Sequence, residues 1–241
     1  MAAAVSKRLT IDVNDITQVS GLLEIPNGSK LCLVLAHGAG AGMVHPFMAA
    51  IAQNLAARGI ASLRYQFPYM EQGQKRTDAA PLCHATVRAA VAAAAQLLPG
   101  VPLIAGGKSL GGRMTSQAQA ADPLPGVRGL AFFGFPLHPP DKPSIDRAAH
   151  LSKVTIPMLF LQGTRDNLAD LTLLRPLLGG LENLATLKVF EGADHSFHVL
   201  KRSGRSDEEV NAEMIDAFVA WAENLSPAFP IARLGGGANG G

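Results

Sequence analysis

The strongest chemical signal in the sequence is the segment Gly107-Lys108-Ser109-Leu110-Gly111. It follows an apolar stretch, residues 102–106, and precedes a helical pattern that begins at residue 110. A Gly-x-Ser-x-Gly motif between a strand and a helix is typical of a nucleophile elbow, a sharp turn that holds a serine hydroxyl above the edge of a sheet. The spacing therefore predicts that Ser109 is a nucleophile.

Nucleotide binding is a rival interpretation of two glycine-rich segments. A phosphate-binding loop of the form Gly-x-x-x-x-Gly-Lys-Ser would need glycine at position 102, which is Pro102. A dinucleotide fingerprint that starts at Gly38 would need glycine at position 43, which is Met43. Because neither motif is complete, no nucleotide cofactor is expected.

The loop 37–42, His-Gly-Ala-Gly-Ala-Gly, fits another function. A hydrolase with a nucleophile elbow binds the oxyanion through the N–H of the residue after the nucleophile and through a second N–H from such a loop. We therefore predict that Leu110 and Ala39 donate these N–H groups and that Gly40 contacts the substrate. The alternative is a glycine-rich turn without a ligand. His37 is expected to be a hydrogen-bonded loop residue.

A serine hydroxyl needs a base that takes its proton. His195 stands in Gly-Ala-Asp-His-Ser, directly after the last predicted strand, and His198 is a nearby alternative. These two histidines could form a metal pair, but no further ligand has the spacing of a metal site. Neither a metal nor any other cofactor is expected.

The base in turn needs a carboxylate that orients the imidazole. Asp166, in Gly-Thr-Arg-Asp, directly follows a predicted strand and is the preferred candidate. Asp170 and Asp194 remain alternatives. Asp170 lies about one helical turn later, and the side chain of Asp194 would normally diverge from the adjacent imidazole. The order Ser109, Asp166, His195 differs from the orders of chymotrypsin and subtilisin.

Apolar runs alternate with helical patterns along the chain, which predicts an α/β fold with an open, mostly parallel sheet and helices on both faces. Strands are predicted at 31–36, 60–64, 102–106, 128–133, 156–161 and 186–190, with two antiparallel edge strands at 8–13 and 21–25. Helices are predicted at 47–58, 82–98, 110–120, 168–178 and 207–224. We expect a single domain over residues 1–233 and a flexible, glycine-rich tail over 234–241.

Composition narrows the classes of function. Hydrophobic residues make up 48% of the chain and charged residues 17%, which suits a large core and argues against disorder. The net charge is only +2, without a dense basic stripe, so no nucleic-acid partner is expected. No apolar run approaches the ~20 residues of a membrane span, and the first residues lack the apolar core of a signal peptide. Cys32 and Cys83 fall in a predicted strand and helix, so a cytoplasmic protein without disulfides is expected.

With these motifs the chain resembles the α/β-hydrolases, nearest to the small dienelactone-hydrolase-like and related bacterial hydrolases. The resemblance covers roughly residues 31–224 and rests on the His-Gly-Ala-Gly loop, the Gly-Lys-Ser-Leu-Gly elbow, Gly-Thr-Arg-Asp and Gly-Ala-Asp-His-Ser. Dienelactone hydrolase has a cysteine nucleophile where this chain has Ser109. The resemblance therefore implies serine esterase chemistry rather than a dienelactone substrate.

The expected function is hydrolysis of a small carboxylic ester or thioester through an acyl-enzyme. The alternatives are a peptidase or amidase on the same three residues, and a non-catalytic interaction protein that keeps the fold. Residues 134–152 contain four prolines, which favour a stiff crossing loop over a substantial cap domain.

Further residues near the predicted site have two interpretations each. Tyr65 and Tyr69 begin a long loop after a predicted strand and are predicted to bind substrate. Lys108, Arg113 and Arg165 lie beside the candidate catalytic residues. These cations either select anionic substrates or are solvated or paired structurally. The oligomeric state is left open by the sequence.

Overall fold

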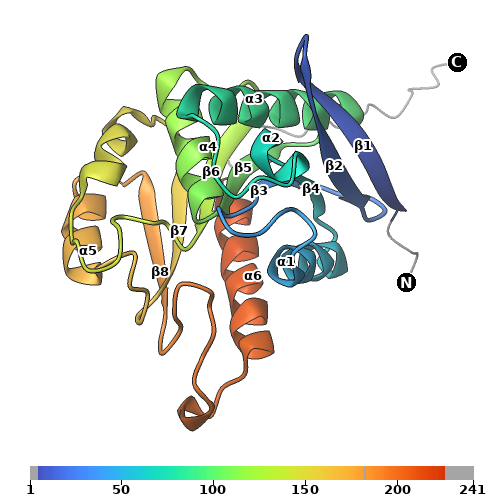
Figure 1. Cartoon of the computed structure of the whole chain (residues 1–241). Helices are drawn as coiled ribbons and strands as arrows, with labels where there is room; N and C mark the ends of the chain where they lie inside the picture. Colours follow the sequence, from blue (N-terminus) through green and yellow to red (C-terminus); the bar gives the residue numbers. More distant parts are fainter. Residues whose placement is uncertain (1–4, 182, 226–241) are drawn as a thin grey trace, which may run out of the picture.

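The centre of the molecule is an eight-stranded sheet with the strand order β1-β2-β4-β3-β5-β6-β7-β8, seen in a computed structural model that describes residues 5–181 and 183–225 (Figure 1). The strands are β1 (Val5–Asn14), β2 (Thr17–Ile25), β3 (Cys32–Ala36), β4 (Ala61–Tyr65), β5 (Leu103–Lys108), β6 (Val127–Phe133), β7 (Met158–Gly163) and β8 (Ala185–Phe190). β1 and β2 pair antiparallel, and β3 to β8 run parallel. The predicted α/β class with an antiparallel edge is confirmed. The predicted tail, 234–241, lies outside the described residues.

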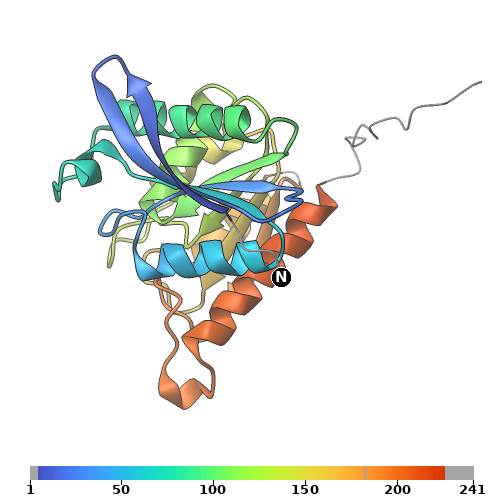
Figure 2. The ribbon, with the colours of Figure 1, turned by 90° about the vertical axis from the view of Figure 1, so that its right-hand side faces the viewer.

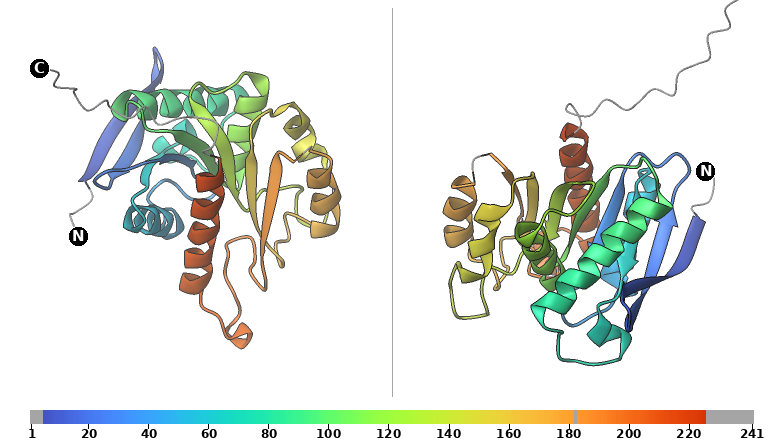
Figure 3. Two further views of the ribbon diagram at one scale, coloured as in Figure 1. Left: turned by 180° about the vertical axis from the view of Figure 1, so that it is seen from behind. Right: turned by 90° about the horizontal axis from the view of Figure 1, so that it is seen from above.

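Helices cover both faces of the sheet (Figures 2 and 3). One face packs against α1 (Pro46–Ala57) and α6 (Asp207–Asn224), and the other against α3 (Ala80–Leu97), α4 (Leu110–Ala121), α5 (Leu171–Gly179) and the 3₁₀ helix η1 (Asp146–Lys153). In β3, Val34 faces the second group of helices and its neighbours Leu33 and Leu35 face the first. Both faces of the strand are therefore buried, which explains its continuous apolar sequence.

The chain reverses its direction of travel across the sheet between β3 and β5. β3 leads through α1 to β4 on one side, whereas β4 returns through α3 to β5 on the other side. Ala36 at the end of β3 is in register with Gly107 near the end of β5. Such a switch point opens a crevice at the carboxyl ends of the strands. The loops after β6, β7 and β8 begin at the same edge of the sheet, since these strands are also parallel and in register.

Several elements differ from the sequence prediction only in their bounds, and two were not predicted. A short helix, α2 (Pro68–Glu71), lies within the long loop after β4, and a 3₁₀ turn, η2 (Lys201–Ser203), precedes α6. Residues 134–145, between β6 and η1, contain no regular helix or strand, so no large cap covers the sheet edge. No helix among the described residues is long and apolar enough to cross a membrane.

Candidate active site

Ser109 occupies a strained turn between β5 and α4. Its backbone φ is 50° and ψ is −115°, a conformation that is uncommon for a residue other than glycine. The turn is tight because β3 passes directly beside it: a Cβ on either Gly107 or Gly111 would lie 2.6 Å from the Ala36 carbonyl oxygen. The two glycines of the motif thus allow the close approach that lifts Ser109 above the sheet edge, as an elbow requires.

The predicted base lies in hydrogen-bond contact with this serine. His195 Nε2 is 2.9 Å from Ser109 Oγ, and His195 Nδ1 is 2.7 Å from Asp166 Oδ2. A carboxylate can only accept, so Nδ1 carries the proton of the neutral imidazole and Nε2 is free to accept the serine proton. The structure therefore brings together the three residues that the motifs singled out, in the arrangement of a nucleophile, a base and an orienting acid.

The carboxylate of Asp166 is fully buried and is held by donors on both oxygens. Oδ1 accepts the Leu168 N–H at 2.8 Å, and Oδ2 also accepts from the side-chain amide of Gln162. The amide oxygen of Gln162 accepts the Phe135 N–H at 3.0 Å, which fixes which end of that amide faces Asp166. Sequence reasoning missed Gln162, although a polar residue inside the apolar strand Met158–Gly163 was a visible signal.

The residues that competed for these roles have other contacts. Asp194 Oδ1 accepts the N–H groups of Ser196 and His198 at 2.8 and 3.0 Å, which closes the turn after His195. Asp170 caps α5 by accepting the Thr172 N–H at 2.8 Å. The ring of His198 pairs with Asp207 at 2.9 Å. None of these three side chains is bonded to Ser109 or to the ring of His195 within the described part of the chain.

Two backbone N–H groups border the site beside Ser109. Leu110 is the first residue of α4, so its N–H has no acceptor within the helix. The hydroxyl of Tyr69 donates to the carbonyls of Gly38 and Ala39, at 3.3 and 3.0 Å. In a trans peptide the next N–H points opposite to the carbonyl. The N–H groups of Ala39 and Gly40 therefore point away from Tyr69, and both residues line the cleft.

His37 holds the same loop from its other side. The Phe67 N–H donates to His37 Nε2 at 3.0 Å, so Nδ1 carries the proton and donates to the Gly38 carbonyl at 2.7 Å. Burial lowers the pKa of His37, which favours the neutral ring that these two hydrogen bonds require. The expectation that His37 is a hydrogen-bonded loop residue agrees with this geometry.

The two tyrosines do not lie where a substrate could touch them. Tyr65 is 1% exposed and Tyr69 is 0% exposed, and neither lines the cleft. Burial raises the pKa of both phenols. Tyr65 makes a side-chain hydrogen bond to Thr115, whereas Tyr69 holds the loop after β3. The prediction that they bind substrate is corrected: Tyr65 ends the buried strand β4, and α2 turns the ring of Tyr69 into the core.

A cleft of about 330 Å³ opens over Ser109 and His195. Its lining residues are Gly38, Ala39, Gly40, Ala41, His45, Phe47, Met48, Lys108, Ser109, Leu168, His195 and Ser196. Of the three cations noted in the sequence, Lys108 donates to the His195 carbonyl and Arg165 donates to the Gly192 carbonyl at 3.1 Å. Arg113 does not line this cleft, and its Nε is buried without a hydrogen-bond partner.

The sequence model of the alpha/beta hydrolase domain family matches residues 29–223. The chain belongs to this family. Similar solved structures include an alpha-beta serine hydrolase homologue from Coxiella burnetii, with 18% identity and a TM-score of 0.71 over 88% of this chain and 96% of that chain. A dienelactone hydrolase from Anabaena variabilis has 20% identity and a TM-score of 0.70 over 91% and 99%. A serine hydrolase without lid from Xanthomonas campestris has 19% identity and a TM-score of 0.70 over 90% and 94%. At these identities the likeness shows the shared fold.

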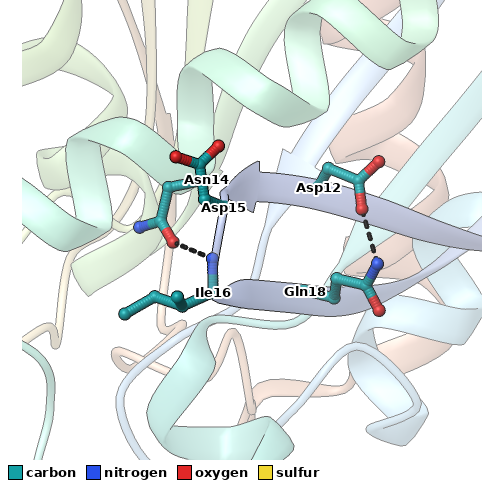
Figure 4. Close-up of a pocket in the computed structure, with 5 residues that line it drawn as sticks. All are labelled: Asp12, Asn14, Asp15, Ile16 and Gln18. Carbon is teal, nitrogen blue, oxygen red and sulfur yellow. Dashed lines mark hydrogen bonds between the residues drawn. The ribbon is translucent and has the colours of Figure 1, made fainter.

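A second hollow of this α/β-hydrolase lies at the β1–β2 hairpin, remote in sequence from the elbow (Figure 4). Its polar groups bond to one another: Gln18 Nε2 donates to Asp12 Oδ1 at 2.7 Å, and the Ile16 N–H donates to Asn14 Oδ1 at 3.1 Å. Its lining has carboxylates but no serine, cysteine or histidine, so the hydroxyl and imidazole pair found in the cleft over Ser109 is not repeated there. Within the described residues, no cluster of His, Cys, Asp and Glu could hold a metal ion.

Proposed function

We propose that this α/β-hydrolase cleaves a small carboxylic ester or thioester through an acyl-enzyme on Ser109. The observation that carries the proposal is the continuous hydrogen-bond path from Ser109 Oγ to His195 Nε2, at 2.9 Å, and from His195 Nδ1 to Asp166 Oδ2, at 2.7 Å. The two bonds are directed so that His195 Nε2 can take the hydroxyl proton, because the buried Asp166 carboxylate accepts the proton on the other ring nitrogen.

In the first step Ser109 Oγ attacks the carbonyl carbon while His195 Nε2 takes the hydroxyl proton. The charge that develops on the carbonyl oxygen is stabilised by the N–H groups of Leu110 and Ala39. His195 then gives its proton to the leaving alcohol or thiol, and an acyl-enzyme forms. Water attacks this ester with His195 as the base, and the carboxylic acid leaves as Ser109 regains its proton. Asp166 stays ionised and holds the imidazolium in both steps.

The size and lining of the cleft support a small substrate. Phe47, Met48 and Leu168 supply apolar surface beside the nucleophile, but the segment 134–145 does not form a cap that would enclose a long chain. Each buried CH₂ contributes ~0.8 kcal/mol only where protein covers it. Chains longer than the cleft therefore gain little further binding energy.

The test is covalent labelling followed by a substrate screen. A fluorophosphonate probe should label the full-length protein at Ser109, and Ser109→Ala should abolish the label while the urea midpoint of unfolding stays near that of the wild type. p-Nitrophenyl esters, thioesters and aminoacyl amides should then be compared by kcat/KM. An unlabelled wild type would contradict the proposal and favour a non-catalytic interaction protein. Labelling with turnover of amides alone would favour a peptidase or amidase.

A further inference from the structure

Lys108, the residue before the nucleophile, places its ammonium group behind the base. Its Nζ donates to the main-chain carbonyl of His195. The same ammonium lies 5.8 Å from the ring centre of Phe47 and 5.4 Å from that of Phe197, within the range of cation–π attraction. Lys108 ends β5, Phe47 lies in the first turn of α1, and Phe197 follows His195. One cation thus joins three separate segments that border the cleft.

The loop that carries His195 contains a strained residue that packs against α1. Phe197 has a φ of 64°, a strained value for an aromatic residue, and its ring stacks on Phe47 at 6.0 Å. Asp194 closes the turn from within the loop. Among the described residues, no donor other than Lys108 reaches the His195 carbonyl. Lys108 therefore supplies a bond between this loop and the strand that ends at the nucleophile.

The charges around Lys108 are not arranged as an ion pair. Asp166 and Asp194 attract the ammonium from a distance, without a direct contact, and the imidazole of His195 lies beside it: a Cβ on Gly134 would be 2.9 Å from Nζ and 3.4 Å from the ring. Burial outweighs both carboxylates and lowers the pKa of Lys108 to about 8. The folded chain then binds fewer protons than the unfolded chain between about pH 8 and the ordinary lysine pKa. The charged Lys108 therefore opposes folding below pH 8 and no longer opposes it at alkaline pH.

We infer that Lys108 is a positioning residue, whose ammonium fixes the His195 loop to the nucleophile strand so that Nε2 stays in line with Ser109 Oγ. The inference rests on the proposed hydrolase function. Burial of the ammonium opposes folding while its hydrogen bond orders the base, so removal of this side chain should lower activity without lowering stability. Removal of a side chain that only supported the fold would lower both.

The experiment compares the full-length wild type with Lys108→Met, Lys108→Gln and Lys108→Arg. Lys30→Met is the matched control, because Lys30 is exposed and precedes β3 at the opposite end of the strands. The assays are fluorophosphonate labelling, kcat and KM for the best short ester between pH 6 and 10, with the Ser109→Ala rate subtracted, and urea unfolding at pH 7. Labelling of the wild type tests the proposed function by itself, before any Lys108 variant is considered.

Lys108→Met should lower kcat at pH 7 by about 10- to 100-fold, the range for loss of a hydrogen bond from a charged donor. KM should stay within about twofold, because the ammonium bonds to the loop rather than to the acyl group, and the urea midpoint should be no lower than that of the wild type. The wild-type kcat should fall above about pH 8, as Lys108 loses its charge. Lys108→Gln should show no such fall, and Lys108→Arg should keep activity at pH 9.

Two results would overturn the inference while leaving the proposed function intact. One is a labelled, active Lys108→Met with wild-type kcat and the same alkaline decline. The other is a loss of kcat that runs parallel to a loss of the urea midpoint in both Lys108→Met and Lys108→Gln, which would make Lys108 a support of the fold. If Lys108→Met does not fold, Lys108→Gln and Lys108→Arg decide by the same criteria.

Discussion

Replacing Asp166 with asparagine tests how the buried donors orient the acid. Asparagine offers one oxygen to three donors, since the carboxylate accepts from Leu168 on Oδ1 and from His195 and Gln162 on Oδ2. If the asparagine oxygen takes the Oδ2 position, its NH₂ group lies against one donor, the Leu168 N–H. If the oxygen takes the Oδ1 position, the NH₂ group lies against two donors, the Gln162 amide and the His195 ring. The first orientation has fewer conflicts and keeps the proton on His195 Nδ1.

This orientation sets the size of the expected loss. If the imidazole keeps its tautomer, Asp166→Asn removes only the charge that stabilises the imidazolium. Two unit charges at ~4 Å interact by about 4 kcal/mol at an effective dielectric of ~20, which corresponds to roughly 10³-fold in rate. A forced change of tautomer costs about 10⁴-fold. Removing the Gln162 donor as well frees the second orientation, so Asp166→Asn with Gln162→Leu should fall toward the larger loss.

The assay is kcat for a short p-nitrophenyl ester at pH 7, together with the NMR resonances of the His195 ring nitrogens, which report the tautomer. Asp170→Asn is the matched control, because asparagine can still cap α5 by accepting the Thr172 N–H. A wild-type kcat in Asp166→Asn, or an equal loss in Asp170→Asn, would refute the assignment of the acid. The Nε2-protonated tautomer in the single variant would refute the argument from Gln162.

Three further outcomes are expected. Tyr69→Phe removes the hydroxyl that fixes the Gly38 and Ala39 carbonyls and should lower kcat about tenfold, less than deletion of an oxyanion donor, whereas the control Tyr65→Phe should keep the wild-type kcat. For p-nitrophenyl esters from acetate to palmitate, kcat/KM should peak at about two to six acyl carbons; a steady rise through decanoate would contradict the open cleft. Burial lowers the pKa of His150 to about 4, so the folded chain binds fewer protons than the unfolded chain and stability should fall as the pH drops from 6.5 toward 4. His150→Gln should weaken this dependence of stability on pH in urea titrations, and an unchanged dependence would show that His150 does not cause it.

The fold and the three aligned side chains were accessible from the sequence because each depends on local signals. Strands buried on both faces are continuous apolar runs, and Ser109 and Asp166 each follow such a run at the carboxyl edge of the sheet, while His195 follows the edge strand β8. The roles of Tyr69 and Gln162 were not accessible in this way. Whether a tyrosine after a strand faces solvent or the core depends on α2, which has only four residues and no periodic pattern. Gln162 was visible as a polar residue in an apolar strand, but the orientation of its amide depends on the Phe135 N–H of the loop after β6, which no local pattern records.

Each loop of the site is held by a polar side chain from a neighbouring strand or helix. Tyr69 bonds the loop after β3, Gln162 bonds Asp166 after β7, and Lys108 bonds the carbonyl of His195 after β8. Loops have few neighbours and are mobile unless such bonds order them. A serine hydrolase gains rate only if the base and the oxyanion donors are in place before the charge develops. Tyr69 and Gln162 would meet that requirement without lining the cleft, so the residues that order the site need not be the residues that touch the substrate.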